Sequence, residues 1–161
     1  MNSVLPGHMS SDKSAERGSA PPPGQELPTH PDLSLTLPAR AENVAVIRHA
    51  IGGLGEALDL HDQILSDVKL AVTEACTNAV VHAYPDGEGP VEVAVYIGDE
   101  MLMLVVRDEG RGIVPRTDSP GLGLGLPLIA TLAEALELGT DEADRTEVRM
   151  TFRFAPEDVA A

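Results

Sequence analysis

Residues 70–84 read LAVTEACTNAVVHAY, and this stretch decides the fold. Apolar and small side chains recur at the three- and four-residue spacing of an amphipathic helix, with Val72, Cys76 and Ala79 on its apolar side. Glu74 and Asn78 are four residues apart, so they project together from the opposite face. A solvated polar face is the ordinary explanation of such a pair on a helix.

Apolar neighbours favour a second explanation for the pair. Leu70, Val80 and Val81 flank the polar face, which indicates contact with a sheet, a partner or a ligand. A carboxylate beside a carboxamide, both partly shielded from water, offers oxygen atoms to a hard cation. The Glu74 carboxylate is also a candidate general base.

A second candidate element follows the stretch 101–106, which is apolar on both faces and predicts a central strand. It reads Asp108-Glu109-Gly110-Arg111-Gly112. A loop that needs positive φ would explain Gly110 or Gly112 without a ligand. The acid at the end of a buried strand needs a hydrogen-bond donor, and the exocyclic amine of a purine would serve.

The third element is a glycine run that ends at the start of a helix expected over residues 126–137. Gly121, Gly123 and Gly125 leave the backbone bare, and Pro127 is acceptable only in the first turn of that helix. Free N–H groups at a helix start form a cradle for phosphate. A hinge or close helix packing explains many such runs, and neither the Rossmann fingerprint nor a P-loop is present.

The predicted elements alternate without regular βαβ units. Besides the helix at 126–137, we expect strands at 33–37, 91–97, 101–106 and 148–154 and helices at 41–59 and from Asp62 or Ser66 to about Tyr84. Gly52, Gly53 and Gly55 permit a break in the first helix. This order predicts an α+β protein, a two-layer α/β sandwich whose mixed sheet carries helices on one face.

The first 31 residues are expected to form a disordered tail rich in Pro, Ser and Gly, followed by one domain over residues 32–156. The formal charge of −15 would repel nucleic acid and anionic lipid. The single cysteine, Cys76, is expected to be buried filler. Without a long apolar run or a signal sequence, a soluble cytoplasmic protein is expected.

The three elements together, in this order, resemble the GHKL ATPase superfamily, which has the Bergerat fold. The block at 70–84 with the compact glycine region looks like the anti-sigma factor and serine-protein kinase family of the RsbW/SpoIIAB type, over residues 33–154. The resemblance implies that Glu74 is the catalytic base and Asn78 binds Mg²⁺. It implies that Asp108 reads the adenine amino group, that Thr146 supports the adenine pocket and that His82 is structural.

The glycines also take roles from this resemblance. Gly110 and Gly112 match positions around the base and at the start of the ATP lid, and Gly121, Gly123 and Gly125 match the phosphate side. The sequence departs from the family pattern at two places. Only eight residues separate Gly112 from Gly121, which makes a short lid, and an arginine at position 145 stands where glycine is usual before Thr146.

The implied function is regulatory. Such proteins bind ATP and Mg²⁺, sequester an alternative sigma factor, phosphorylate a serine of an antagonist STAS-domain protein and form homodimers. The acidic surface suits capture of a basic sigma-factor region and not direct binding of nucleic acid or membrane. The short lid and Arg145 favour an alternative, a nucleotide-loaded module that sequesters a partner without phosphoryl transfer. A structural adaptor that binds no nucleotide is the third hypothesis.

Overall fold

The computed structural model describes residues 20–110 and 125–154. Its elements are β1 (Leu33–Pro38), α1 (Ala41–Ala57), α2 (Asp62–Asn78), a π-helical segment (Ala79–Ala83), β2 (Pro90–Ile97), β3 (Met101–Asp108), α3 (Gly125–Leu132), β4 (Ala135–Thr140) and β5 (Thr146–Arg153). Within these ranges no helix has the length and apolar character needed to cross a bilayer.

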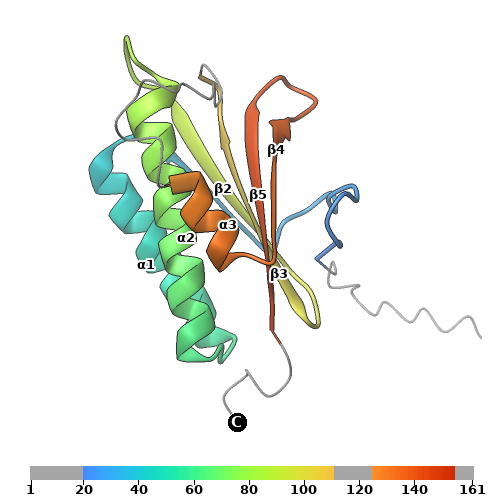
Figure 1. Ribbon diagram of the computed structural model, residues 1–161. Helices are drawn as coiled ribbons and strands as arrows, with labels where there is room; N and C mark the ends of the chain where they lie inside the picture. Colours follow the sequence, from blue (N-terminus) through green and yellow to red (C-terminus); the bar gives the residue numbers. More distant parts are fainter. Residues whose placement is uncertain (1–19, 111–124, 155–161) are drawn as a thin grey trace, which may run out of the picture.

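Five strands form one sheet in the order β1-β2-β3-β5-β4. All three helices lie on one face of this sheet, with α2 between α1 and α3 (Figure 1). The predicted α+β sandwich with helices on one face is therefore confirmed. The mixed sheet is a correction, because all four strand pairs are antiparallel. Short connections join β2 to β3 and β4 to β5, and such hairpins bring consecutive strands together in opposite directions.

The core lies between the sheet and the helices. Alternate residues of β3 and β5 point toward the helices, in the pattern that the period of a strand requires. The central members are completely buried: Val72 and Cys76 of α2, Leu104 of β3 and Met150 of β5. The prediction that Cys76 is buried filler is thus confirmed, and burial raises the pKa of its thiol to about 12.

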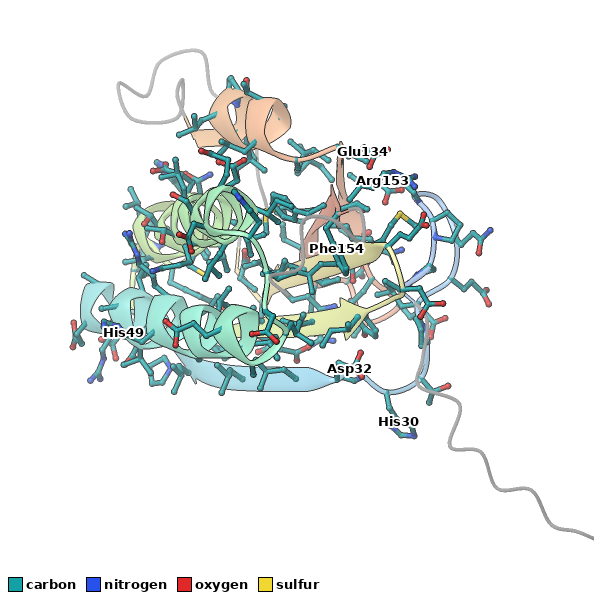
Figure 2. All side chains as sticks on the ribbon, turned by 90° about the horizontal axis from the view of Figure 1, so that it is seen from below. His30, Asp32, His49, Glu134, Arg153 and Phe154 are labelled. Carbon is teal, nitrogen blue, oxygen red and sulfur yellow. The ribbon has the colours of Figure 1, made fainter. Side chains whose placement is uncertain are left out.

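The helix expected over residues 126–137 is shorter than predicted, because α3 ends at Leu132 and β4 begins at Ala135. Leu136 and Leu138 alternate with more polar neighbours, and the strand pairs along its whole length with β5. A hydrogen bond stabilises the bend of the chain between α3 and β4, where the Glu134 N–H donates to the Thr151 carbonyl at 2.8 Å. Figure 2 shows Glu134 beside Arg153, whose Nε donates to both carboxylate oxygens at 2.9 and 3.1 Å.

The glycines of α1 do not break the helix, which runs unbroken to Ala57. A Cβ on Gly55 would lie 2.3 Å from Leu65 Cδ1 of α2, so the missing side chain lets the two helices approach closely. The next helix is capped by His61, whose Nδ1 accepts from the N–H of Gln63, and not by Asp62 or Ser66 as expected. Asp62 lies in the first turn, where its charge suits the helix dipole.

Part of the other face of the sheet is covered by residues 20–27, which belong to the segment expected to be tail. Ala20 and Leu27 contact a cluster made by Ala94, Tyr96, Met103 and Val105. Figure 1 shows this segment on the side of the sheet away from the helices. The segment accounts for the apolar character of both faces of β3. A disordered tail was expected over the first 31 residues, but residues 20–31 have a defined structure. Residues 1–19 lie outside the described ranges.

Candidate functional site

Helix α2 directs its polar row toward α3. Asn78 lies against the first residue of α3, because a Cβ built on Gly125 would be 3.0 Å from Asn78 Nδ2 and 3.1 Å from Oδ1. The same helix face carries Asp67, eleven residues before Asn78. Asp67 lines a pocket together with Leu132, the residue at the other end of α3. Glu74 lies between these two contacts, one turn before Asn78, and is half-buried. The predicted pairing of carboxylate and carboxamide on one helix face is therefore placed beside α3.

The start of α3 brings a second kind of group to Asn78. Gly125 is buried and is the first residue of the helix. The first N–H groups of a helix have no partner within it and carry the positive end of the dipole. A carboxamide and a helix start thus meet at one place, which suits an anion and its counter-ion. Gly112, Gly121 and Gly123 lie outside the described residues.

Asp108 and Thr146 are the second group of candidate site residues. They are directly opposite each other in the ladder between β3 and β5, and both are buried on the face toward the helices. Burial raises the pKa of Asp108, and the N–H of Gly110, which donates to Oδ1 at 3.0 Å, opposes that rise. This N–H stabilises the charged form of the carboxylate. A buried carboxylate of this kind suits a ligand that brings a hydrogen-bond donor.

Gly110 is a glycine because of a close approach. A Cβ at this position would lie 2.1 Å from the carbonyl oxygen of Ala83, the last residue of the π-helical segment. Its φ lies outside the left-handed region, so the explanation by positive φ is not needed at Gly110. The turn after β3 thus rests directly on the end of the helical run that carries Asn78.

The spacing of the two parts follows from this contact. Asn78 and Ala83 are five residues apart along the helical run, which corresponds to roughly 8 Å along a helix axis. Asp108 and the turn at Gly110 therefore lie near one end of the run, and Asn78 with Gly125 lies farther back. An extended ligand with a hydrogen-bond donor at one end and anionic groups at the other matches this arrangement.

Arg145, the departure from the family pattern, points away from the site. Its Nε donates to Asp141 at 2.8 Å and its Nη1 to Glu92 at 3.0 Å, both on the other face of the sheet. The same face holds Arg107, which donates to Glu92 at 2.6 Å and to Glu147 at 2.7 Å. These ion pairs keep the Arg145 guanidinium off the face where Asp108 and Thr146 lie.

The protein side chains alone do not form a metal centre in the described parts of the chain. Within residues 20–110 and 125–154, no group of three or more His, Cys, Asp or Glu side chains is placed to hold a metal ion. Mg²⁺ is often bound through one or two protein oxygens, with phosphates and water as the remaining ligands. Asn78 and Glu74 fit that kind of site. His82 is half-buried, and its structural role stays a prediction.

Comparison with known proteins identifies the class of this chain. Residues 37–152 match the model of the histidine kinase-like ATPase domain family. A serine-protein kinase RsbW of Halalkalibacterium halodurans is 32% identical over 124 residues, which cover 68% of this chain and 76% of that protein. The chain therefore belongs to the histidine kinase-like ATPase family and, within it, to the RsbW group of serine-protein kinases.

Further relatives agree with this membership. A serine-protein kinase RsbW of Bacillus cereus is 32% identical over 125 residues, which cover 68% of this chain and 78% of that protein. The fold is also that of a solved structure containing the RsbU and RsbW domains of Rv1364c from Mycobacterium tuberculosis, with a TM-score of 0.57 and 24% identity. That match covers 79% of this chain and 33% of the solved one.

One residue of this region was not singled out by the sequence patterns. Tyr84 closes the quoted block, and its hydroxyl contacts the turn that follows Asp108. The available signal was its rarity, since the chain has only two tyrosines and no tryptophan. Its position immediately before Pro85, at the end of a helical stretch, was a second signal.

Proposed function

We propose that this protein is an ATP-binding anti-sigma factor with serine-protein kinase activity toward a STAS-domain antagonist of that factor. The curated relatives carry the name serine-protein kinase. The observation that supports a nucleotide site is the contact of Asn78 with Gly125 at the start of α3, on the same helix row as Glu74. The buried Asp108 carboxylate supplies the base-reading group at the other end.

The proposed nucleotide lies along α2. Asp108 accepts a hydrogen bond from the adenine amino group through its carboxylate, and Thr146 lies opposite it in the ladder. The phosphates lie near Asn78 and the N-terminus of α3. In the proposal Gly110, Gly112, Gly121, Gly123 and Gly125 line the nucleotide, as the resemblance implies. When bound, Mg²⁺ neutralises phosphate charge, with the Asn78 carboxamide as a protein ligand.

The proposed reaction transfers the γ-phosphoryl group of ATP to a serine hydroxyl. The serine Oγ forms a bond to the γ-phosphorus as the bond from that phosphorus to the β–γ bridging oxygen breaks, and ADP leaves. The Glu74 carboxylate accepts the proton of the serine hydroxyl. Its place one turn before Asn78 puts this base on the same row as the group that orients the phosphates.

We infer the partners of the protein from its family and its net charge. The net charge of −15 suits a basic region of an alternative sigma factor and disfavours direct contact with nucleic acid. A homodimer in the cytoplasm is the proposed state. The alternative, a module that sequesters a partner without phosphoryl transfer, loses one of its two supports because Arg145 is engaged on the other face of the sheet.

A phosphotransfer assay tests the proposal. The purified chain is incubated with γ-labelled ATP, Mg²⁺ and candidate STAS-domain proteins. Glu74→Gln is expected to reduce label transfer by roughly 10²- to 10⁴-fold while nucleotide binding persists. Glu56→Gln on the exposed surface of α1 is the matched control, with the same loss of charge. Transfer that survives in Glu74→Gln would refute the assigned base, and binding without transfer in the wild type would favour the sequestering module.

A further inference from the structure

Tyr84 joins three segments that are distant in the sequence. Its hydroxyl oxygen accepts from the N–H of Glu109 at 2.7 Å, and the hydroxyl donates to the carbonyl of Pro90 at 2.6 Å. The residue follows the π-helical segment directly, Pro90 begins β2, and Glu109 is the first residue after β3. One phenol thus connects the end of the helical run to the ends of two strands.

The position of this phenol is determined by its surroundings. The hydroxyl donates its single proton to the Pro90 carbonyl and accepts the Glu109 N–H through an oxygen lone pair, so both hydrogen-bond partners of the hydroxyl are fixed. The ring lies against Gly89, where a Cβ would be 2.1 Å from Tyr84 Cε1. Burial raises the pKa of the Tyr84 phenol, which keeps the hydroxyl protonated as the geometry requires.

The turn held by Tyr84 is the one that carries the base-reading side of the proposed site. The ladder between β3 and β5 ends at the pair of Asp108 and Thr146, so Glu109 and Gly110 lie beyond its support. Two contacts place this turn on the helical run. They are the hydrogen bond from Glu109 to Tyr84 and the close approach of Gly110 to Ala83.

We propose that Tyr84 is a positioning residue that sets the turn after Asp108 at a fixed place relative to the helical run bearing Glu74 and Asn78. The base side and the phosphate side of one nucleotide site are then held at the correct separation. This inference rests on the proposed function, because it assigns Tyr84 to that same nucleotide site. Tyr84 itself makes no contact with substrate in this assignment and acts through the turn.

A comparison of three ligands separates this role from general stabilisation. Affinities for ATP with Mg²⁺, for adenosine and for inorganic tripolyphosphate with Mg²⁺ are measured by calorimetry on the full chain and on Tyr84→Phe. We expect ATP and adenosine to bind roughly five- to tenfold more weakly to the variant, the loss that corresponds to one net hydrogen bond. Tripolyphosphate, which has no base, should bind with unchanged affinity.

A matched control is available in the second tyrosine. Tyr96 is buried on the face of the sheet away from the helices, and Tyr96→Phe removes the same hydroxyl group there. This control should leave all three affinities unchanged. Equal affinities of wild type and Tyr84→Phe for ATP would overturn the inference, and so would an equal loss for ATP and tripolyphosphate. Failure of the wild type to bind any of the three ligands would instead overturn the proposed function and the inference with it.

A second measurement covers the case in which Tyr84→Phe does not fold. The chain has two tyrosines and no tryptophan, so Tyr96→Phe leaves Tyr84 as its only tyrosine. The fluorescence of this variant should change on addition of adenosine or ATP with Mg²⁺, because the turn touching the phenol contacts the base. It should stay constant with tripolyphosphate. Constant fluorescence with all three ligands, at concentrations that calorimetry shows to be saturating for adenosine and ATP, contradicts the assignment.

Discussion

Gly110→Ala is the substitution whose effect the geometry specifies most closely. The added Cβ would lie 2.1 Å from the carbonyl oxygen of Ala83 and 2.6 Å from its carbonyl carbon. Both atoms belong to the backbone of a helical segment, so neither can move away by a rotamer change, as the end of a flexible side chain could. Relief of the overlap requires the turn to move away by about 1 Å, since non-bonded carbon atoms prefer separations of roughly 3.5–4.0 Å.

The displacement determines the expected magnitude. Two hydrogen bonds hold the turn, from Gly110 to Asp108 at 3.0 Å and from Glu109 to Tyr84 at 2.7 Å. A shift of this size takes the bond from Glu109 to Tyr84 beyond hydrogen-bonding distance, at a cost of about 1 kcal/mol, and strains the local bond within the turn. With the packing strain, Gly110→Ala should lower the free energy of unfolding by about 2–3 kcal/mol. The corresponding fall in Tm is about 10 °C for a domain of this size.

Thermal and urea denaturation followed by circular dichroism measure this effect. Gly53→Ala is the control, because a Cβ at that exposed position of α1 meets nothing within 4 Å. It should raise the free energy of unfolding by up to about 1 kcal/mol through helix propensity. Gly110→Ala should also weaken ATP binding, since Asp108 precedes the displaced turn. If Gly110→Ala is as stable as wild type, or shifts Tm in the same direction as Gly53→Ala, the close approach to Ala83 does not determine the residue at this position.

Three further results are expected. Gly55→Ala should lower the free energy of unfolding by about 1–3 kcal/mol, whereas Gly53→Ala raises it, because only the Cβ at position 55 would lie 2.3 Å from Leu65 Cδ1. Urea titrations that give a change of the same sign for both variants would contradict this packing argument. Burial raises the pKa of Asp108, and the adenine amine needs the ionised carboxylate of this residue. The affinity for ATP, measured by calorimetry, should therefore fall as the pH drops from neutral through that pKa. The Asp108→Asn variant should lack this part of the pH dependence. Leu27→Ala should lower the free energy of unfolding by about 1 kcal/mol and expose the Tyr96 face to a hydrophobic dye; unchanged melting would mean that residues 20–27 add no stability.

Local patterns were sufficient for most elements. The alternation in β1, β2, β3 and β5 has the strand period, and the helical spacing in α1 and α2 has the helix period, so these elements were predicted from the sequence. The pairing of Glu74 with Asn78 on one face is likewise a consequence of helix geometry. Both kinds of prediction depend only on residues within a few positions of one another.

The errors arise where distant residues compete with local preference. Residues 133–137 continue an apolar helical pattern, but pairing with β5 makes most of them part of β4. A mixed sheet was expected because strand direction depends on which strands become neighbours, and this is a property of the whole chain. The outward turn of Arg145 depends on Asp141 and Glu92, and Glu92 is 53 residues away in the sequence.

The sequence by itself determined the family, the helix that carries Glu74 and Asn78, and the kinds of residue available to a nucleotide. Tertiary structure decided which of these groups meet. Asn78 lies against Gly125, Asp108 lies opposite Thr146, and Tyr84 holds the turn after β3. The physical reason is that side-chain periodicity is a local property of the backbone, whereas a site assembled from α2, α3, β3 and β5 requires the packing of segments far apart in the chain.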